Sequence, residues 1–256
     1  MDLMLRNEVV VVTGSSRGIG RAIAKGFAAE GSQLVLCARG ANALQAFAAE
    51  LREGGTDVTA VIADVQSEAG RSAVVEAAYA AYGRIDVLVH NVGGGGGPGF
   101  FETSVAQWDE ALDLNLRAPL ELSRLVVPEM IERRSGVVLF VSSVFGREWG
   151  GRPAYMAAKA AEIALAKSMA RELAPHGVRV CSVAPGSILF PGGGWDRRQK
   201  EDPEKIAAFV AAELPMGRFG RPEEVADVVV FLASRRASLV VGGSIAVDGG
   251  QSRSLI

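Results

Sequence analysis

Short runs of β-branched and other apolar residues alternate with longer Ala-rich segments along almost the whole chain. We expect strands at Val9–Thr13, Gln33–Cys37, Val58–Ala63, Ile85–His90, Gly136–Ser142, Val178–Ala184 and Ser244–Val247. Several of these runs, such as VVVV and VVLFV, are apolar without alternation, which is the pattern of strands covered on both faces. The apolar pattern therefore predicts a parallel sheet between two layers of helices.

The segments between these runs have the spacing of helices that bury one face. We expect helices at Ile19–Glu30, Ala41–Glu53, Ser67–Tyr82, Val105–Glu132, Ala154–Ala174 and Glu223–Ala233. The repeated order of strand, helix and strand predicts an α/β fold, namely a doubly wound Rossmann-type sheet, mostly parallel, with about seven strands and helices on both faces. Because the sequence shows no linker, low-complexity tail or internal repeat, we expect residues 1–256 to form a single domain.

Two segments interrupt this alternation. Gly93–Gly99 reads GGGGGPG, and Ser187–Pro203 is expected to be a long irregular insertion. Both follow predicted strands, and ligands of such sheets bind beyond the carboxyl ends of the strands. We therefore expect both to wall a binding site, with residues 187–215 as a substrate-side lid, and the alternative is a pair of disordered surface loops. Phe190 and Trp195 favour an ordered lid, because disordered segments are poor in aromatic residues.

Charge and cysteine usage narrow the class of protein. The chain has 27 Lys and Arg against 29 Asp and Glu, so its net charge of −2 provides no basic field for nucleic acid. Cys37 and Cys181 lie far apart in apolar runs, so we expect buried reduced thiols and no metal site. The segment MDLMLRNEVVVV lacks the features of a signal peptide, and no uncharged apolar run reaches about 18 residues. These features predict a cytoplasmic protein that does not enter the membrane.

The turn after the first predicted strand points to a cofactor. Thr13–Gly20 reads TGSSRGIG and leads directly into a predicted helix. Glycines at such a turn let the backbone approach a diphosphate, which then meets the free N–H groups and the positive dipole end of the helix. The spacing is G-x-x-x-G-x-G rather than G-x-G-x-x-G, but its place in the first βαβ unit predicts dinucleotide binding.

The end of the second predicted strand bears on which dinucleotide binds. The run LVLCAR contains no acidic residue that would bind the ribose 2′-hydroxyl of NAD. Arg39 and Arg17 would offer two cations to a 2′-phosphate, so we prefer NADP(H) and keep NAD(H) possible; the alternative is that both arginines are merely solvated. Asp64 could accept a hydrogen bond from the adenine amino group or cap the following helix. Asn91 and Gly93, after the fourth strand, would border the ribose.

A second set of residues carries candidate chemistry. Tyr155 and Lys159 stand four apart in a predicted helix and so share one face of it. An ammonium beside a phenol favours the phenolate by Coulomb attraction, which would make the tyrosine useful as an acid or base. Ser142 and Ser143 close the preceding strand and could hold a carbonyl or alcohol oxygen. The plain structural alternatives are a core tyrosine with its lysine in solvent and a serine pair that only forms a turn.

Together these motifs resemble the short-chain dehydrogenase/reductase family. The resemblance covers practically the whole chain, with TGSSRGIG at Thr13–Gly20, DV at Asp64–Val65, HNVGG at His90–Gly94, LNL around Asn115, VSSVFG at Val141–Gly146, YMAAK at Tyr155–Lys159, PGS at Pro185–Ser187 and VDGG at Val247–Gly250. Eight motifs in the order of the family are far more specific than any one of them.

The resemblance implies catalytic roles for four residues. Tyr155 would be the general acid/base, and Lys159 would favour its ionised form and hold the nicotinamide ribose. Ser143 would position the substrate oxygen, being the second serine of the SSxxG pattern, and Asn115 would support a water-linked proton relay. The expected cofactor-binding residues are Gly14, Ser16, Arg17, Gly18, Ile19, Gly20, Arg39, Asp64, Val65, Asn91, Gly93, Tyr155, Lys159, Pro185, Gly186, Ser187 and Ile188.

The chain departs from the family pattern at several places. The interval from Ser143 to Tyr155 is one residue shorter than is commonest, and the fourth-strand motif reads HNVG where the family usually has NNAG. Val92 is bulkier than the usual alanine, and Ser187 stands where the family often has threonine. These departures affect cofactor packing and the choice of serine, while the Tyr–Lys pair is intact.

The expected activity is hydride transfer between NADP(H) and a carbonyl or secondary alcohol, with reduction as the working direction. Substrates of 3-oxoacyl-carrier reductases and of sugar-acid or polyol dehydrogenases are both compatible. The alternatives are an NAD-dependent polyol or sugar dehydrogenase and a catalytically idle NADP-binding regulatory protein. His90 and His176 have no obvious partner in the sequence and are expected to be structural, which leaves no hydrolytic triad.

The lid and the C-terminal region bear on ligands and partners. The lid contains apolar residues, and its Arg197 and Arg198 could anchor an anionic substrate or simply be solvated. Members of the family commonly form tetramers through their long helices and C-terminal strand. The apolar run Ala237–Val247 is compatible with that interface, so we expect a homotetramer.

Overall fold

The computed structural model describes residues 1–255. In this part of the chain seven strands form one sheet in the order β3-β2-β1-β4-β5-β6-β7, and each neighbouring pair is parallel. The strands are β1 Val9–Thr13, β2 Gln33–Ala38, β3 Val58–Ile62, β4 Val87–His90, β5 Gly136–Val141, β6 Val178–Pro185 and β7 Ser244–Val247. The predicted doubly wound α/β fold is confirmed, and this sheet is parallel throughout where the sequence predicted a mostly parallel one.

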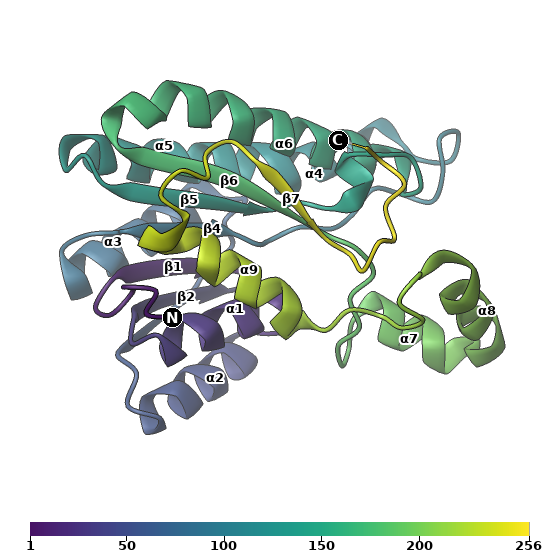
Figure 1. Cartoon of the computed structure of the whole chain (residues 1–256), viewed down its shortest axis with the longest axis horizontal. Coiled ribbons are helices and arrows are strands. Elements are labelled where there is room, and N and C mark those ends of the chain that lie inside the picture. The colour runs from purple at the N-terminus through teal and green to yellow at the C-terminus, as the bar shows by residue number, and fades with distance from the viewer. Residues whose placement is uncertain (256) are drawn as a thin grey trace.

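Helices cover both faces of the sheet (Figure 1). They are α1 Gly18–Ala29, α2 Ala41–Glu53, α3 Glu68–Tyr82, α4 Val105–Leu112, α5 Ala118–Glu132, α6 Pro153–Leu173, α7 Gly194–Glu201, α8 Pro203–Glu213 and α9 Pro222–Ala233. Helices α1, α2 and α9 pack on one face, and α3, α5 and α6 pack on the other. Among residues 1–255, no helix combines the length and the apolar character needed to cross a membrane.

Successive residues of β1 belong to two separate cores. Val10 and Val12 lie in the cluster shared with α1, α2 and α9, whereas Val11 lies in the cluster shared with α3, α5 and α6. All three side chains are fully buried, so the strand requires an apolar residue at every position. Cys37 and Cys181 are buried free thiols, as predicted. Burial and the negative charge of Asp64 raise the pKa of the Cys37 thiol to about 12.

The prediction of one continuous helix over Val105–Glu132 is wrong. Helix α4 ends at Leu112, residues 113–117 form a π-helical segment, and α5 begins at Ala118. Within that segment the Asn115 side-chain amide donates to the Ala111 carbonyl at 2.7 Å. A side chain that competes for helix carbonyls disturbs the regular hydrogen-bond ladder, and such π-helical bulges occur often at functional sites. The break leaves Asn115 fully buried.

The prediction that Ser187–Pro203 is irregular is also wrong, because α7 occupies Gly194–Glu201 and α8 begins at Pro203. Asp202 caps α8 by accepting a hydrogen bond from the Lys205 N–H at 3.0 Å, and Pro203 supplies the first helical residue. Lys200 and Asp196 form an i,i+4 ion pair at 2.8 Å in α7. Figure 1 shows the two helices standing apart from the layered body.

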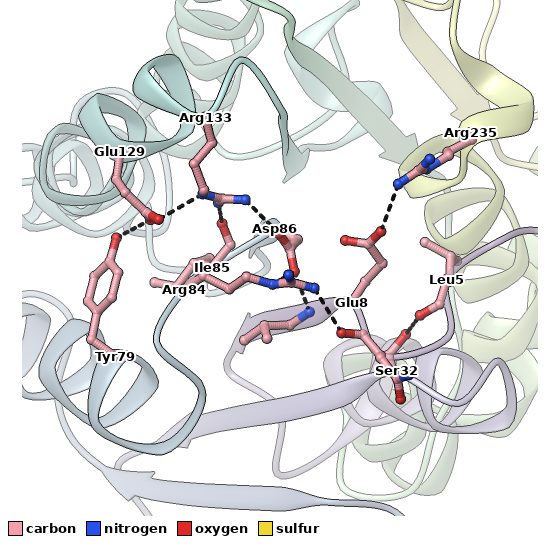
Figure 2. A network of polar contacts seen from close by, with 12 residues as sticks. Leu5, Glu8, Ser32, Tyr79, Arg84, Ile85, Asp86, Glu129, Arg133 and Arg235 are labelled. Atoms are coloured by element: carbon pink, nitrogen blue, oxygen red, sulfur yellow. Dashed lines mark hydrogen bonds and ion pairs between the residues drawn. The ribbon is translucent and has the colours of Figure 1, made fainter.

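The amino end of the sheet is closed by a network of paired charges (Figure 2). Asp86 lies just before β4 and is buried. One of its oxygens accepts from the Val9 N–H at 2.8 Å and the Arg84 Nε at 2.9 Å, and the other accepts from Arg133 at 2.8 Å. Arg133 also pairs with Glu129 at 2.7 Å. The network ties β1, β4 and α5 together at the end of the sheet opposite the cavity described next.

Candidate active site

A cavity of about 650 Å³ lies at the carboxyl ends of the strands. That volume is within the usual range for cofactor and ligand sites. The predicted site residues that line it are Gly14, Ser16, Arg17, Ile19, Arg39, Asp64, Val65, Asn91, Gly93, Ser143, Tyr155, Lys159, Pro185, Gly186 and Ile188. The structure thus brings residues from six of the predicted motifs around one space.

Four predicted site residues lie behind this lining. Gly18 and Gly20 belong to the first turn of α1. Asn115 is fully buried in the π-helical segment. Ser187 is buried, and its backbone N–H donates to the Gln251 side chain at 2.7 Å. These residues shape the wall from behind rather than forming its surface.

The glycine turn is built for close approach. Gly18 has a φ of +56°, and a methyl group at this position would lie 2.7 Å from the Phe190 ring, so the turn has no room for a side chain. The Asn91 amide donates to the carbonyls of Thr13 and Gly14 at 3.0 and 3.2 Å, which ties the end of β4 to the turn. Helix α1 starts at Gly18 within this turn, and the free N–H groups of a helix start are suited to a diphosphate.

The far end of the cavity has two exposed cations. Arg17 and Arg39 both line the cavity, and the Arg39 side chain is mostly exposed. Arg39 lies 3.7 Å from Asp64, a contact too long and too exposed to occupy the guanidinium fully. Ser67, not Asp64, caps α3, because the Ser67 hydroxyl accepts from the Gly70 N–H. The capping alternative for Asp64 is therefore wrong.

The two serines after β5 have different partners. Ser142 donates its hydroxyl to the Lys159 carbonyl at 3.2 Å, which fastens the strand end to α6. Ser143 accepts a hydrogen bond from the Phe145 N–H at 3.2 Å, which leaves its own O–H group for another acceptor. Both residues line the cavity. The geometry favours Ser143 as the serine that can donate to a ligand oxygen.

Tyr155 and Lys159 project from the first turns of α6 toward the same cavity. Tyr155 is partly exposed, whereas Lys159 is 1% exposed. The Lys159 ammonium donates to the Val141 carbonyl and to the Glu162 carboxylate, both at 2.9 Å. The alternative that places Lys159 in solvent is therefore wrong. Glu162 is itself fully buried and was not predicted as part of the site.

Asn115 fixes the glycine-rich loop after β4. Its amide donates to the Gly94 carbonyl at 2.8 Å, and its Oδ1 accepts from the Gly94 N–H at 3.1 Å. A methyl group on Gly93 would lie 2.9 Å from Asn115 Oδ1 and 3.0 Å from Lys159 Nζ, so only glycine lets the two side chains approach the same point. The loop is therefore held as a wall and does not form a helix or strand.

His90 has a partner that the sequence did not reveal. Its Nε2 lies 2.8 Å from the Ser123 hydroxyl of α5. Burial, with the nearby charge of Lys159, lowers the pKa of His90 to about 3, so the ring is neutral. This buried contact, with a residue 33 positions away in the sequence, is consistent with the expected structural role of His90.

The lid contributes an aromatic wall. Trp195 stacks on Phe209 with centroids 4.6 Å apart and lies 5.1 Å from Phe219. Arg198 lies over the Trp195 ring at 4.8 Å. Trp195 and Phe190 both line the cavity, so the lid faces the site rather than solvent alone.

Several lining residues were not among the predicted catalytic and cofactor-binding residues, although Phe190 and Trp195 belong to the predicted lid and Ser142 was an alternative to Ser143. They are Cys37, Ala38, Gly40, Ala63, Val92, Leu114, Val141, Ser142, Phe190 and Trp195. Half are apolar residues at or just after strand ends, and nothing in their type distinguishes these from core residues. Apart from Trp195, each lies one or two residues from a predicted site residue, and this position is the signal that could have identified them.

The chain is similar to proteins of known name over nearly its full length. The family model described as enoyl-(acyl carrier protein) reductase matches residues 14–252. The 3-oxoacyl-(acyl-carrier-protein) reductase FabG of Thermotoga maritima is 36% identical over 249 residues, which cover 97% of this chain and 99% of that protein.

Solved structures agree with this similarity. L-sorbose reductase from Gluconobacter frateurii, complexed with NADPH and L-sorbose, has a TM-score of 0.93 at 35% identity and covers 100% of both chains. A 7α-hydroxysteroid dehydrogenase complexed with NADH and 7-oxo glycochenodeoxycholic acid has a TM-score of 0.90 at 32% identity, covering 100% of this chain and 98% of that one.

Proposed function

The chain belongs to the short-chain dehydrogenase/reductase family, and we propose that it is an NADP(H)-dependent carbonyl reductase in which Tyr155 is the general acid/base. As a member it is an oxidoreductase that uses a nicotinamide cofactor. The observation that carries the proposal is that Tyr155 and Lys159 line the same cavity as the glycine turn. A catalytic pair and a dinucleotide site therefore share one space.

The residues around the cavity fit a dinucleotide. The turn at Gly18 has no room for a side chain, and the start of α1 provides N–H groups for a diphosphate. Arg17 and Arg39 would bind a 2′-phosphate, and this supports a preference for NADP(H) over NAD(H). One structural neighbour was solved with NADPH and another with NADH, so the neighbours favour neither cofactor. The proposed preference for NADP(H) therefore rests on these two arginines.

The proposed roles at the chemical end follow from the contacts. A nicotinamide cofactor held by these residues would supply the hydride in reduction and accept it in oxidation. Tyr155 gives a proton to the substrate oxygen in reduction and removes it in oxidation. Ser143 donates a hydrogen bond that holds this oxygen, and Lys159 acts on the phenol and holds the cofactor ribose. Asn115 anchors the loop beside Lys159 and supports the path by which protons reach it.

The cofactor-binding residues proposed for this chain are those predicted from the sequence. They are Gly14, Ser16, Arg17, Gly18, Ile19, Gly20, Arg39, Asp64, Val65, Asn91, Gly93, Tyr155, Lys159, Pro185, Gly186, Ser187 and Ile188. The first turn of α1 contributes through its backbone at Gly18 and Gly20, which explains why these two lie behind the cavity surface.

We also propose the wider organisation of the enzyme. The whole chain forms one domain, and residues 187–215 form its substrate-side lid, which the aromatic contacts of Trp195 support. A cytoplasmic homotetramer is proposed from the family resemblance. The fully exposed Leu239 and the edge strand β7 support an interface at the end of the sheet. Light scattering that shows a monomer at micromolar concentration would contradict the tetramer.

The test of the proposed activity is a substrate panel of ketones, 3-oxo esters and sugar acids, followed by NADPH absorbance. We expect at least one class to be reduced. The Tyr155→Phe variant should lose about a hundredfold or more of that turnover because it cannot transfer the proton, while NADPH affinity changes little. Retained turnover would remove Tyr155 from its role, and no NADPH oxidation with any compound would favour an idle NADP-binding protein.

Cofactor preference is tested at Arg39. We expect wild type to bind NADPH more tightly than NADH, and Arg39→Asp to reverse this order by about tenfold or more, since it replaces a cation with a carboxylate that suits a 2′-hydroxyl. Fluorescence titration with both cofactors measures the change. Arg236→Asp, at an exposed position that does not line the cavity, is the matched control and should leave the ratio unchanged.

A further inference from the structure

A buried carboxylate lies directly behind the proposed catalytic lysine. Glu162 is 0% exposed, and its Oε2 accepts a hydrogen bond from Lys159 Nζ at 2.9 Å. Its other oxygen, Oε1, is buried and has no hydrogen-bond partner among residues 1–255. Buried polar atoms are nearly always paired, so an unpaired carboxylate oxygen at this place calls for a functional explanation.

The surroundings of Glu162 contain one opposing charge. Lys159 is the charged group that acts on the carboxylate, and the Ser142 hydroxyl at the end of β5 also favours its ionised form. His90 on β4 lies within electrostatic reach of Lys159 but is neutral. Asn115, on the π-helical segment, is uncharged. Burial outweighs the favourable contacts and raises the pKa of Glu162 to about 7. The carboxylate therefore carries its negative charge above neutral pH.

The three residues lie along one side of α6. Tyr155, Lys159 and Glu162 are at positions i, i+4 and i+7, so their side chains project from the same helix face, with the lysine in the middle. The carboxylate is ~10 Å along the axis from the tyrosine. A negative charge at that distance acts on the phenol with the sign opposite to that of the ammonium.

We propose that Glu162 is a positioning residue whose negative charge offsets that of Lys159 and so opposes the ionisation of the Tyr155 hydroxyl. The proposal rests on the proposed function, in which this hydroxyl gives its proton to a carbonyl oxygen. With its charge partly offset, Lys159 still acts on the phenol but favours the phenolate less than an unpaired ammonium would. The pair therefore suits the site to reduction rather than to oxidation, which needs the phenolate.

The test is a pH titration of phenolate absorbance in the full-length protein without substrate. The chain has three tyrosines. Burial raises the pKa of both Tyr79 and Tyr82, so these two ionise late. The ionisation step that disappears in Tyr155→Phe identifies the step of Tyr155. In Glu162→Gln, which keeps the shape and removes the charge, we expect this step to move to lower pH by about one unit.

Two further variants make the result specific. Glu162→Asp keeps the charge but withdraws it by one methylene, and it should move the step in the same direction by less than half as far. Glu172→Gln makes the same chemical change at an exposed position on the same helix and should leave the step in place. If Glu162→Gln does not fold, the shift of the Tyr155 ionisation step in Glu162→Asp tests the proposal instead. An unchanged step in the folded Glu162 variants would overturn the proposal and leave an ion pair of purely structural importance.

The outcome is separable from that of the proposed function. The titration requires no substrate and no cofactor, so it can succeed even when no compound of the panel is reduced. Where a substrate is found, the pH at which alcohol oxidation reaches half its maximal rate should fall by a similar interval in Glu162→Gln. In Glu162→Gln the rate of carbonyl reduction should also begin to fall at a lower pH than in wild type, by a similar interval. A uniform fall in rate at every pH, with no displacement of the profile, would contradict the proposed role.

Discussion

A buried carboxylate lies at each end of the parallel sheet, and the two carboxylates differ in their hydrogen-bond partners. At the amino end, both oxygens of Asp86 have partners, which are the Val9 N–H, Arg84 and Arg133 (Figure 2). At the carboxyl end, Glu162 has one oxygen paired with Lys159 and one without a partner among the described residues. The amino-end cations are partly exposed, whereas Lys159 is buried.

The contrast separates a stabilising network from a functional one. A fully paired carboxylate fastens strands and helix together and has no capacity left for chemistry. A buried pair with an unsatisfied oxygen is a poor source of stability, because the cost of removing both charges from water can exceed their attraction. The sheet thus has a carboxylate with both oxygens paired at one end and a carboxylate with one unpaired oxygen, among the described residues, at the end where the cavity lies.

The largest expected effect comes from replacing the carboxyl-end pair by apolar residues. We expect the double variant Lys159→Met/Glu162→Leu to lose at least about a hundredfold in turnover, because the group that acts on Tyr155 is gone. Its free energy of unfolding should stay within about 1 kcal/mol of wild type or rise. Steady-state kinetics and urea unfolding measure the two quantities. A loss of several kcal/mol in stability would place this pair in the same class as the amino-end network.

The next effect is a pH dependence confined to the carboxyl end. The pKa of Glu162 is raised from 4.5 in the unfolded chain to about 7 in the fold. Between these values the folded protein keeps a proton that the unfolded chain has released, so the contribution of Glu162 to stability is present below pH 4.5 and is lost as the pH rises to about 7. The loss amounts to about 3 kcal/mol at most.

Urea unfolding of wild type and Glu162→Gln at several pH values between these limits measures this contribution. Because the variant cannot ionise, its stability should gain on that of wild type as the pH rises. Curves that stay parallel over the whole interval would show that the folded carboxylate ionises at the same pH as the unfolded one. In that case the difference between the two ends of the sheet would be smaller than the structure indicates.

The smallest effect belongs to the amino end. Asp86→Asn keeps an acceptor for the Val9 N–H but removes the charge that pairs with Arg84 and Arg133. We expect the free energy of unfolding to fall by about 2 kcal/mol, less than for a fully buried pair because both arginines are partly exposed. Turnover per folded molecule should not change. Asp109→Asn, at an exposed position, is the control and should shift stability by less than about 0.5 kcal/mol.

The sequence predicted the parts of the fold that depend on local pattern. The strand at Val9–Thr13 and the glycine turn after it were predicted correctly. A strand buried on both faces requires continuous apolar residues, and a tight turn requires glycine, so both can be recognised from residue type. The lid helices were missed because their start is glycine-rich and α7 is strongly polar, so no apolar face marks them. The π-helical segment was missed because it depends on where the Asn115 side chain finds its acceptors.

The sequence predicted those site residues that belong to recognisable motifs and missed the others. Tyr155 and Lys159 carry a recognisable spacing, and the structure places both at the cavity. Glu162 stands among alanines in a helix of low amphipathic contrast, where a glutamate ordinarily faces solvent. Its burial follows from how α6 packs on β5 and β6, which is a property of the folded chain. The contact of His90 with Ser123 joins residues 33 apart and depends on packing in the same way.

The aromatic cluster of the lid bears on how this protein can diverge. Trp195, Phe209 and Phe219 pack with Ile206 and Leu214 in a group of their own, separate from the clusters that flank the sheet. Mutations in this group can remodel the entrance for new molecules while the strands and the proton-transferring pair keep their support. Selection for another substrate can therefore act on this separate cluster, while the residues proposed for hydride and proton transfer stay unchanged.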